Sequence, residues 1–372
     1  QIGPNNWVME LFHGPTIAFK DYALQVLGRL FDYVLTKRGE RVTIVGATSG
    51  DTGSAAIEAC KDCKNIDIFI LHPEGRTSDV QRRQMTTVEA DNVHNIALKG
   101  TFDDCQNLVK AMFNDQEFRN EMNLSAVNSI NWARIMAQIV YYISASLAMG
   151  GPLRKVSFSV PTGNFGNIYA AYAAKRMGLP IEKLVIGSNR NDILTRFFES
   201  GSMKSETVEP SLSPSMDIQI SSNFERYLCD LVDRDTTSIK KLMLSFKEKG
   251  VFSISDAHMN RMRETFNAHR CSDQQTIDIM RACYYETGYT LDPHTAVGVF
   301  AGLQVRNDPS IPMISLACAH PAKFPDAVKE AIGMEPPLPD HMANLLDLPE
   351  FFTPIENDLA RVQSFVKDKV QS

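Results

Sequence analysis

Two glycine-rich segments could each enclose an anion. The first spans residues 42–54 and contains Thr-Ser-Gly-Asp-Thr-Gly at residues 48–53; the second spans residues 159–168 and contains Pro-Thr-Gly-Asn-Phe-Gly-Asn at residues 161–167. Each follows a β-branched run and leads into a helical pattern, so exposed amides and the helix dipole could bind phosphate or carboxylate. The first segment lacks the P-loop lysine, which disfavours a Walker nucleotide site. The alternative for both is a tight turn whose Ser or Thr only caps a helix.

A third polar segment and one lysine could also do chemistry. The segment NSINWAR at residues 128–134 opens a helical pattern with three polar side chains and an arginine. Such a set can bind an anion, but capping by Asn128 or Ser129, with Arg134 paired on the surface, is the ordinary alternative. Lys20 stands in an aromatic segment, and without further context it would be a solvated cation.

The elements that must position these residues alternate along the chain. Short β-branched runs predict strands at Arg41–Val45, Ile66–Leu71, Val156–Val160, Leu184–Ile186 and Met313–Ala317. Apolar residues at three- and four-residue spacing predict helices at Ala23–Leu35, Ala133–Ala148, Ile168–Met177 and Gln275–Glu286. This order predicts an α/β fold with parallel sheets and crossover helices. Ligands of such folds bind at the carboxyl ends of strands, where both glycine-rich segments lie.

Length and composition restrict the class of protein. The chain has 372 residues, which exceeds the roughly 250–300 at which a single core stops growing, so we expect two lobes. The net charge is −6 and the basic residues are scattered, so we expect no nucleic-acid partner and no membrane-surface partner. No apolar stretch approaches the ~20 residues that span a bilayer, so we expect a soluble protein.

The cysteines and histidines indicate no metal site. Seven cysteines form an odd set in a chain too large to need disulfides, which favours a reducing compartment, and we expect the cytoplasm. Cys60 and Cys63 form a CxxC pair without the second pair that zinc needs, and we interpret them as structural thiols. His13, His294 and His320 show no metal-ligand spacing either, so we interpret them as structural histidines.

The segment around Lys20 resembles a known family. LFHGPTIAFKD at residues 11–21 is similar to the cofactor-lysine segment of threonine synthases, which are fold-type II enzymes that use pyridoxal 5'-phosphate. The resemblance continues in order through most of the chain, at TSGDTG (48–53), NSINWAR (128–134), PTGNFGN (161–167), SPSMDI (213–218), SSNFER (221–226), LDPHTAVG (291–298) and AHPAKFP (319–325). The number and order of these motifs make the resemblance specific.

The resemblance implies a fold and a domain organisation. The fold would be α/β, of the kind found in the tryptophan synthase β subunit, with two lobes and pyridoxal phosphate in the cleft. A smaller, substrate-closing lobe would span residues 36–140, and a larger cofactor-binding lobe would combine residues 1–35 and 141–372. Family members usually carry a further amino-terminal region before the lysine segment, and we expect it to be largely absent from this chain. The oligomeric state stays open between monomer and homodimer.

The resemblance also implies roles for single residues. Lys20 would hold the cofactor covalently and move protons as the catalytic residue. The implied cofactor-binding residues are Lys20, Asp51, Gly163, Asn164, Phe165, Gly166, Asn167 and Cys318. The implied substrate-binding residues are Thr48, Ser49 and Thr52 for the α-carboxylate and Asn128, Ser129, Arg134 and Lys323 for a phosphate. No metal is implied.

The implied activity is the last step of threonine biosynthesis. The family converts O-phospho-L-homoserine and water to L-threonine and phosphate, by γ-elimination of phosphate and β-addition of water. Cys318 departs from the family, which commonly has threonine at this position facing the pyridine nitrogen, and a thiol is a weaker hydrogen-bond partner than a hydroxyl.

Three alternatives stay open at this point. A threonine-synthase-like phospholyase would release 2-oxobutyrate, ammonia and phosphate, and Cys318 is the feature that favours it. A serine or threonine dehydratase of the same fold would have no use for Arg134 in a second phosphate site. A non-catalytic phosphate-binding relative would not need Lys20. Product analysis and the visible absorbance of the bound cofactor would separate them.

Overall fold

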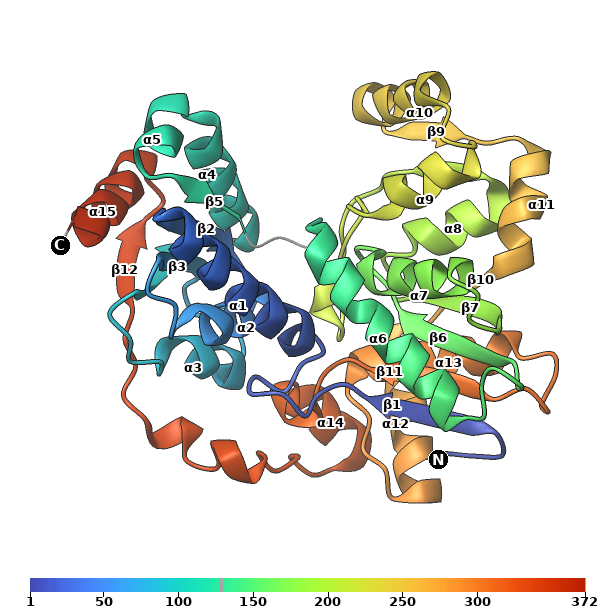
Figure 1. Cartoon of the computed structure of the whole chain (residues 1–372). Helices are drawn as coiled ribbons and strands as arrows, with labels where there is room; N and C mark the ends of the chain where they lie inside the picture. Colours follow the sequence, from blue (N-terminus) through green and yellow to red (C-terminus); the bar gives the residue numbers. More distant parts are fainter. Residues whose placement is uncertain (127–129, 372) are drawn as a thin grey trace. The chain divides into compact units, whose positions relative to one another are not determined.

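The computed structural model describes residues 1–126 and 130–371, and the chain forms two compact units. The first unit comprises Gln1–Leu11 and Arg134–Pro336, and the second comprises Phe12–Ala133 and Pro337–Ser372. Each unit contains a five-stranded parallel sheet with helices packed against it (Figure 1). The predicted α/β class with parallel sheets is confirmed.

The sheet of the first unit has the strand order β1-β11-β6-β7-β10, and every neighbouring pair is parallel. Its strands are β1 (Asn6–Glu10), β6 (Val156–Pro161), β7 (Ile181–Ser188), β10 (Phe266–Arg270) and β11 (Met313–Ala317). All six residues of β6 are buried, as expected of a central parallel strand that is covered on both faces. The loop that follows β6 contains the second glycine-rich segment.

Helices cover both faces of this sheet. The helices of this unit are α6 (Trp132–Ala148), α7 (Gly166–Arg176), α8 (Ile193–Ser200), α9 (Phe224–Leu231), α10 (Thr236–Lys249), α11 (Asp256–Thr265), α12 (Asp273–Thr287), α13 (Pro293–Val305) and α14 (Pro325–Ile332). On one face the ring of Phe158 meets Tyr142 of α6 at 4.9 Å. On the other face Ser159 donates to the carbonyl of Gly298 in α13. Successive strand residues point to opposite faces, so β6 is held between these two helices. A short hairpin of β8 (Ser202–Lys204) and β9 (Val251–Ser253) lies outside this sheet.

The sheet of the second unit has the order β12-β4-β3-β2-β5, again parallel throughout. Its strands are β2 (Val42–Ala47), β3 (Ile66–Pro73), β4 (Val93–Lys99), β5 (Leu124–Ser125) and β12 (Thr353–Glu356). Ile68 and Ile70 of β3 pack toward the core that contains Leu24 and Leu27. The alternate residue Phe69 packs into a second core on the opposite face. The apolar run of β3 is therefore buried on both sides.

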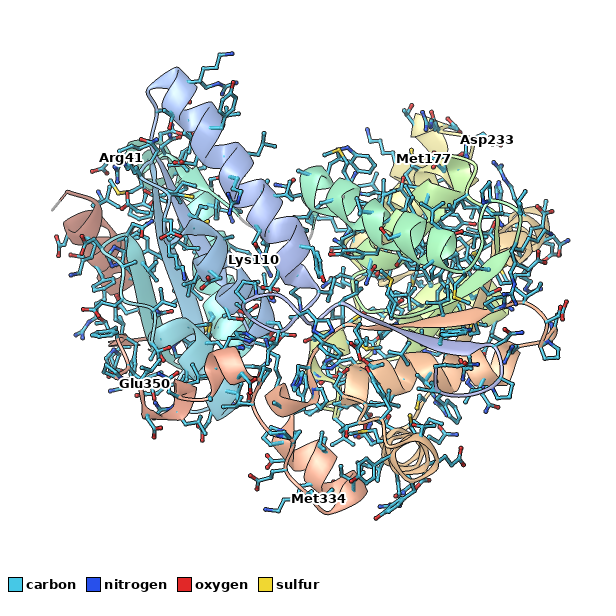
Figure 2. All side chains as sticks on the ribbon, turned by 60° about the horizontal axis from the view of Figure 1, so that its bottom comes forward. Arg41, Lys110, Met177, Asp233, Met334 and Glu350 are labelled. Carbon is cyan, nitrogen blue, oxygen red and sulfur yellow. The ribbon has the colours of Figure 1, made fainter. Side chains whose placement is uncertain are left out.

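The helices of the second unit separate into two layers. α1 (Lys20–Arg38) and α2 (Asp51–Cys60) contribute to the core that contains Leu24, and α4 (Phe102–Asn114), α5 (Gln116–Glu121) and α15 (Leu359–Gln371) contribute to the core that contains Phe69. The layers are visible on the two sides of this sheet in Figure 1. α3 (Asp79–Thr86) follows β3 and carries Arg82, whose Nε and Nη2 donate to Glu350 at 2.9 and 3.0 Å. Glu350 is labelled in Figure 2.

The unit boundaries differ from those that the resemblance implied. Residues 12–35, expected in the larger lobe, belong with residues 36–133, because α1 packs on α2 through Gly28. A Cβ at Gly28 would overlap the carbonyl oxygen of Ala59, so the two helices touch backbone to backbone. Residues 337–372 also belong to the second unit, because β12 adds to its sheet beside β4.

All five predicted strands and all four predicted helices are present, with ends that differ by a few residues. Among the described strands of four or more residues, β1, β4, β10 and β12 were not predicted. Three of these strands are half exposed or polar in alternate positions, and short patterns of that kind do not stand out from loops. Among the described helices, none combines the length and apolar character needed to cross a membrane.

Candidate active site

Lys20 and Asp51 form an ion pair in the second unit. Lys20 is the first residue of α1 and Asp51 the first of α2, and the close packing of these helices brings Lys20 Nζ to 3.1 Å from Asp51 Oδ2. The side chains are 12% and 6% exposed, so water screens the pair little. The Nζ atom also lies 5.0 Å from the centre of the Phe19 ring. Two predicted cofactor residues therefore meet.

The turn before α1 is fixed by a neighbouring carboxylate. Asp21 accepts a hydrogen bond from the backbone N–H of Thr16 at 2.8 Å and another from its hydroxyl. A Cβ at Gly14 would lie 2.5 Å from an oxygen of Asp21, so only glycine fits at that position. The carboxylate of Asp21 thus holds the turn within the LFHGPTIAFKD segment. This contact fixes the backbone from which the Lys20 side chain extends.

The TSGDTG turn between β2 and α2 is held by Thr48. Its Oγ1 accepts hydrogen bonds from the N–H groups of Gly50 at 3.0 Å and Gly53 at 2.9 Å. Gly50 has φ of +140°, a conformation that favours glycine. The hydroxyl proton of Thr48 stays available for donation, but its oxygen is already used. Ser49 and Thr52, the other predicted donors, are half-buried.

Gln81 of α3 completes this set and was not predicted. Its Nε2 donates to Asp51 Oδ1 at 2.9 Å, so the two oxygens of Asp51 contact side chains from two different helices. Ser78 and Gln81 show the S-x-x-Q pattern that marks a helix start. That signal predicts α3, but nothing local in the sequence indicates that the amide reaches Asp51.

In the first unit, the PTGNFGN loop connects β6 to α7 through a left-handed residue. Phe165 precedes the helix with φ of +63°, and its ring is buried against Phe224 at 5.0 Å between ring centres. Only its backbone is therefore available to a ligand. A side chain at Gly163 would be tightly packed, since a Cβ would lie 3.0 Å from Ile218 and 3.1 Å from the backbone of Met216. The first amides of α7 have no partner within the helix and can bind an anion.

The SSNFER motif hydrogen-bonds to this loop. The sequence alone left its role unassigned. Ser221 Oγ donates to the carbonyl of Gly163 at 2.7 Å, and Ser222 Oγ donates to Asn164 Oδ1 at 3.0 Å. The backbone N–H and the Nδ2 of Asn223 both donate to the carbonyl of Asn164 at 3.1 Å. These contacts occupy carbonyl oxygens, so the loop can keep its amides directed toward a ligand.

Two more predicted cofactor residues meet in the first unit. Asn167 Nδ2 lies 3.8 Å from the sulfur of Cys318, which follows β11. Tyr142 donates its hydroxyl to Asn167 Oδ1 at 2.6 Å, which orients the amide. Burial raises the pKa of Tyr142 well above its ordinary value, so this hydroxyl keeps its proton.

Arg134 is almost completely buried near the start of α6, with 4% of its surface exposed. Its Nε and Nη1 have no hydrogen-bond partner within the described part of the chain. Burial lowers the pKa of Arg134 to about 10, so the guanidinium is still charged at neutral pH. Asn128 and Ser129, predicted beside it, lie outside the described residues. Lys323, in the short turn η2 (Pro321–Lys323), is fully buried.

The remaining motif residues support the fold. Asp292 caps α13 and contacts the Nδ1 of His294 at 3.0 Å. Asp217 of the SPSMDI motif accepts from Asn189 at 2.8 Å and from Asn191 at 2.9 Å. Over residues 1–126 and 130–371, no cluster of three His, Cys, Asp or Glu side chains could hold a metal ion.

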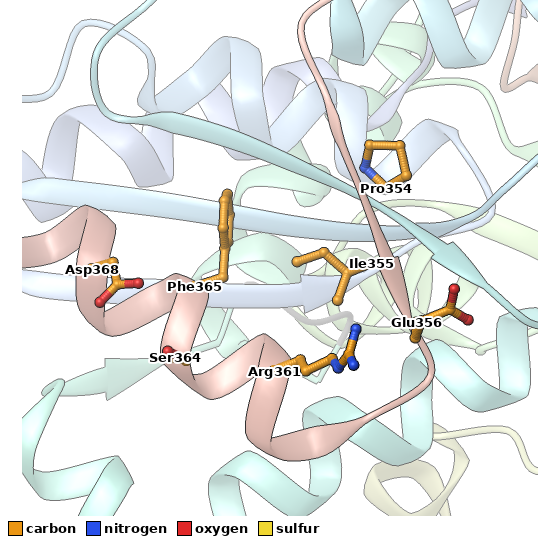
Figure 3. Close-up of a pocket in the computed structure, with 7 residues that line it drawn as sticks. All are labelled: Pro354, Ile355, Glu356, Arg361, Ser364, Phe365 and Asp368. Carbon is orange, nitrogen blue, oxygen red and sulfur yellow. The ribbon is translucent and has the colours of Figure 1, made fainter.

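An open surface pocket lies between β12 and α15, away from the predicted residues (Figure 3). It is lined by Pro354, Ile355, Glu356, Arg361, Ser364, Phe365 and Asp368. Two carboxylates accompany one arginine, so this lining is unsuited to a phosphate. None of the motif residues contributes to it.

Comparisons with known proteins identify the family. A model described as pyridoxal-phosphate dependent enzyme matches residues 1–241, and one described as threonine synthase, C-terminal matches residues 295–366. A threonine synthase of Pseudomonas aeruginosa is 56% identical over 367 residues, covering 98% of this chain and 78% of the relative. The chain belongs to the threonine synthase family. It is a lyase that depends on pyridoxal phosphate, as the resemblance implied.

Solved structures of threonine synthases have the same fold. The pyridoxal-phosphate-bound threonine synthase from Brucella melitensis superposes with a TM-score of 0.98 at 53% identity, covering all of this chain and 80% of that one. The yeast threonine synthase superposes with a TM-score of 0.92 at 42% identity, covering 98% of this chain and 78% of the yeast chain. The expected two-lobe, fold-type II architecture of the threonine synthase family is confirmed.

The described residues fit pyridoxal phosphate within each unit. In the first unit, the loop at residues 163–167 can offer backbone amides to a phosphate, because the carbonyl oxygens of Gly163 and Asn164 already accept hydrogen bonds. In the second unit, Lys20 offers a primary amine that is largely withdrawn from water. An aldehyde that carries a phosphate needs both kinds of group.

Proposed function

We propose that this threonine synthase family member converts O-phospho-L-homoserine and water to L-threonine and inorganic phosphate. The supporting observation is Arg134, whose buried guanidinium has two nitrogens without a partner in the described structure. A buried cation without a counter-ion is costly, and a phosphate would supply acceptors in the planar geometry that a guanidinium prefers. A phosphorylated substrate supplies such an anion in addition to its α-carboxylate, which is proposed to bind at the TSGDTG turn.

Lys20 acts in this proposal as the group that holds the cofactor and then moves protons at the substrate carbons. Bound pyridoxal phosphate supplies the electron sink that makes removal of those protons possible. Asp51, at 3.1 Å, orients the Lys20 amine, and a positioned amine transfers protons more readily than a free one. Phosphate leaves from Cγ and water adds at Cβ.

The other motif residues are divided between the cofactor and the substrate. The amides of residues 163–167 would bind the cofactor phosphate, and Cys318 would face its ring beside Asn167. Thr48, Ser49 and Thr52 would donate to the α-carboxylate of the substrate. Asn128, Ser129 and Lys323 are proposed to bind the substrate phosphate together with Arg134, on the basis of their motifs alone.

A phospholyase is the second candidate. The Cys318 thiol, 3.8 Å from Asn167 Nδ2, stands where the family commonly has a hydroxyl. A weaker partner at the ring would alter how electrons return to the substrate after phosphate leaves. In that case the carbon skeleton would be released as 2-oxobutyrate and the amino group as ammonia, instead of water adding at Cβ.

Product analysis tests this proposal. The protein, loaded with pyridoxal phosphate, is incubated with O-phosphohomoserine, and phosphate, threonine and 2-oxobutyrate are measured together, with Lys20→Ala as the control. Threonine and phosphate in equal amounts, lost in the variant, would support the synthase. Phosphate with 2-oxobutyrate would establish the phospholyase, and absence of turnover would contradict both.

We infer that the protein works in a reducing compartment, for which the cytoplasm is the proposal. All seven cysteines lie in the described ranges, and none forms a disulfide. Cys60 and Cys63 are both buried, in keeping with structural thiols. The proposed partner is the small-molecule substrate alone, with a monomer or homodimer as the assembly. Light scattering of the purified protein would distinguish these two states.

A further inference from the structure

The carboxylate of Asp51 is held from two sides. Oδ2 contacts Lys20 Nζ at 3.1 Å, and Oδ1 accepts from Gln81 Nε2 at 2.9 Å. Asp51 and Gln81 are 4% and 5% exposed, so the hydrogen bond between them is shielded from water. A neutral donor on a buried carboxylate favours its charged form without adding a second charge near the lysine.

The amide of Gln81 can present only its nitrogen to Asp51. Ser78, the N-cap of α3, donates its hydroxyl to Gln81 Oε1 at 3.0 Å and accepts from the backbone N–H of Gln81. A rotated amide would turn its oxygen toward the carboxylate and lose the bond from Ser78. The capping interaction of α3 therefore fixes the donor that Asp51 receives.

Gln81 is also packed against the TSGDTG turn. A Cβ at Gly50 would lie 2.6 Å from Gln81 Cδ and 2.7 Å from its Nε2, so the amide rests directly on the backbone of this glycine. Gly50 immediately precedes Asp51 and the amides of the first turn of α2. The position of the Gln81 side chain is thus linked both to the turn and to the carboxylate.

We propose that Gln81 is a positioning residue of the active site, which orients Asp51 toward Lys20 and keeps it ionised. Ser78 acts behind it by fixing the orientation of the amide. This inference rests on the proposed roles of Lys20 and Asp51 in cofactor binding, and it adds a residue outside every motif of the family resemblance. The relay runs through hydrogen bonds from Ser78 to Gln81 and from Gln81 to Asp51, and then through the ion pair with Lys20.

The test compares two identical substitutions on one helix. Gln81→Leu removes the donor to Asp51, whereas Gln84→Leu removes an equally buried glutamine of α3 whose Nε2 donates to the carbonyl of Thr16 at 3.1 Å. The visible absorbance of bound pyridoxal phosphate is titrated with pH for both variants and the unmodified protein, and thermal melting confirms that each variant is folded.

In Gln81→Leu, we expect the acidic limb of this titration to move to higher pH by about one unit, because a carboxylate that loses a donor takes up a proton more readily. We expect kcat to fall by about tenfold with little change in KM, because one charge-assisted hydrogen bond is lost. Gln84→Leu should lower the melting temperature but leave the titration in place. A titration of Gln81→Leu that matches Gln84→Leu would overturn the inference.

Gln81→Glu is a second test, because its effect on Asp51 should change with pH. A protonated Glu can donate to Asp51 as Gln does, whereas an ionised Glu repels it. We therefore expect the spectrum of this variant to match the unmodified protein at low pH and to depart from it as pH rises. An unchanged spectrum at all pH values would contradict the inference. The titration needs no substrate, so its outcome does not depend on the O-phosphohomoserine assay. Failure of that assay would contradict the proposed function but not the positioning role of Gln81.

Discussion

At the scale of single residues, the structure keeps charged groups buried at the positions assigned to ligands. Arg134 and Asp51 are both less than a tenth exposed, and burial of a charge destabilises a protein unless the charge is paired. Asp51 is paired with Lys20 inside the chain, whereas two nitrogens of Arg134 find no partner in the described residues. The first arrangement orients the lysine amine, and the second leaves two buried donors that an anion could accept from.

Replacing Arg134 should weaken phosphate binding without weakening the fold. In Arg134→Met, the buried cation is replaced by an apolar chain of similar length, a change that is often neutral or stabilising. We expect inorganic phosphate to raise the melting temperature of the unmodified protein, and the variant to bind phosphate at least roughly tenfold more weakly. Arg176→Met, which removes an exposed arginine of α7, is the control. Equal stabilisation of Arg134→Met and the unmodified protein by phosphate would remove Arg134 from the anion site.

His72 should make stability depend on pH. Burial lowers the pKa of His72 below the ordinary value of 6.5, with nearby Arg82 lowering it further and Glu350 opposing this. The unfolded chain therefore takes up a proton first, so stability is complete above about pH 6.5 and falls as pH drops below it, by at most about 1.4 kcal/mol per pH unit. Urea unfolding between pH 7.5 and roughly 5 should show a flatter dependence for His72→Leu. The exposed His341→Leu should keep the original slope, and equal slopes for both variants would contradict this account.

At the scale of elements, α15 supports the sheet that carries the TSGDTG turn. Val366 is fully buried in the core that contains Phe69 and Leu98, although it lies near the end of the chain. Val366→Ala should lower the free energy of unfolding of the second unit by about 2 kcal/mol, through lost apolar contact and a small cavity. Hydrogen exchange should accelerate in β3 and β4 but not in β6. Ser364→Ala, on the exposed face of α15, should have little effect; equal acceleration in both units would show that α15 is not specific to one of them.

The elements show how far the sequence predicts this fold. β3 and β6 were predicted because continuous β-branched runs indicate buried parallel strands. β12 was missed because it has four residues, one of them proline, and only partial burial. Its pairing with β4 joins segments that lie far apart in the sequence, and no local pattern specifies such a partner.

In the candidate site too, local motifs were predicted from the sequence and long-range contacts were not. Residues 163–167 and Lys20 were predicted from motifs, and the structure brings Asn167 to Cys318 and Lys20 to Asp51. Gln81 was missed, because its contact with Asp51 depends on how α3 follows β3 beside β2. The burial of the Phe165 ring was also not foreseen. A motif identifies the residue types of a site. Whether a residue offers its side chain or its backbone to a ligand depends on packing.

At the scale of the whole molecule, each compact unit is built from two separate stretches of chain. Residues 1–11 supply β1 to the first unit, and residues 337–372 return to the second. The family resemblance implied boundaries at residues 35 and 140, with both flanks in the larger lobe. The pairing of β1 with β11 and of β12 with β4 instead places the two chain ends in different units. Lys20 and the loop at residues 163–167 consequently belong to different units.

Lys20 is proposed to hold pyridoxal phosphate in this threonine synthase family member. The most direct measurement is borohydride reduction of the loaded protein, followed by proteolysis and mass spectrometry of the labelled peptide. We expect one phosphopyridoxyl group per chain, on the peptide that contains Lys20, and none in Lys20→Ala. Labelling of another lysine, such as the fully buried Lys323, or undiminished labelling of Lys20→Ala would contradict it.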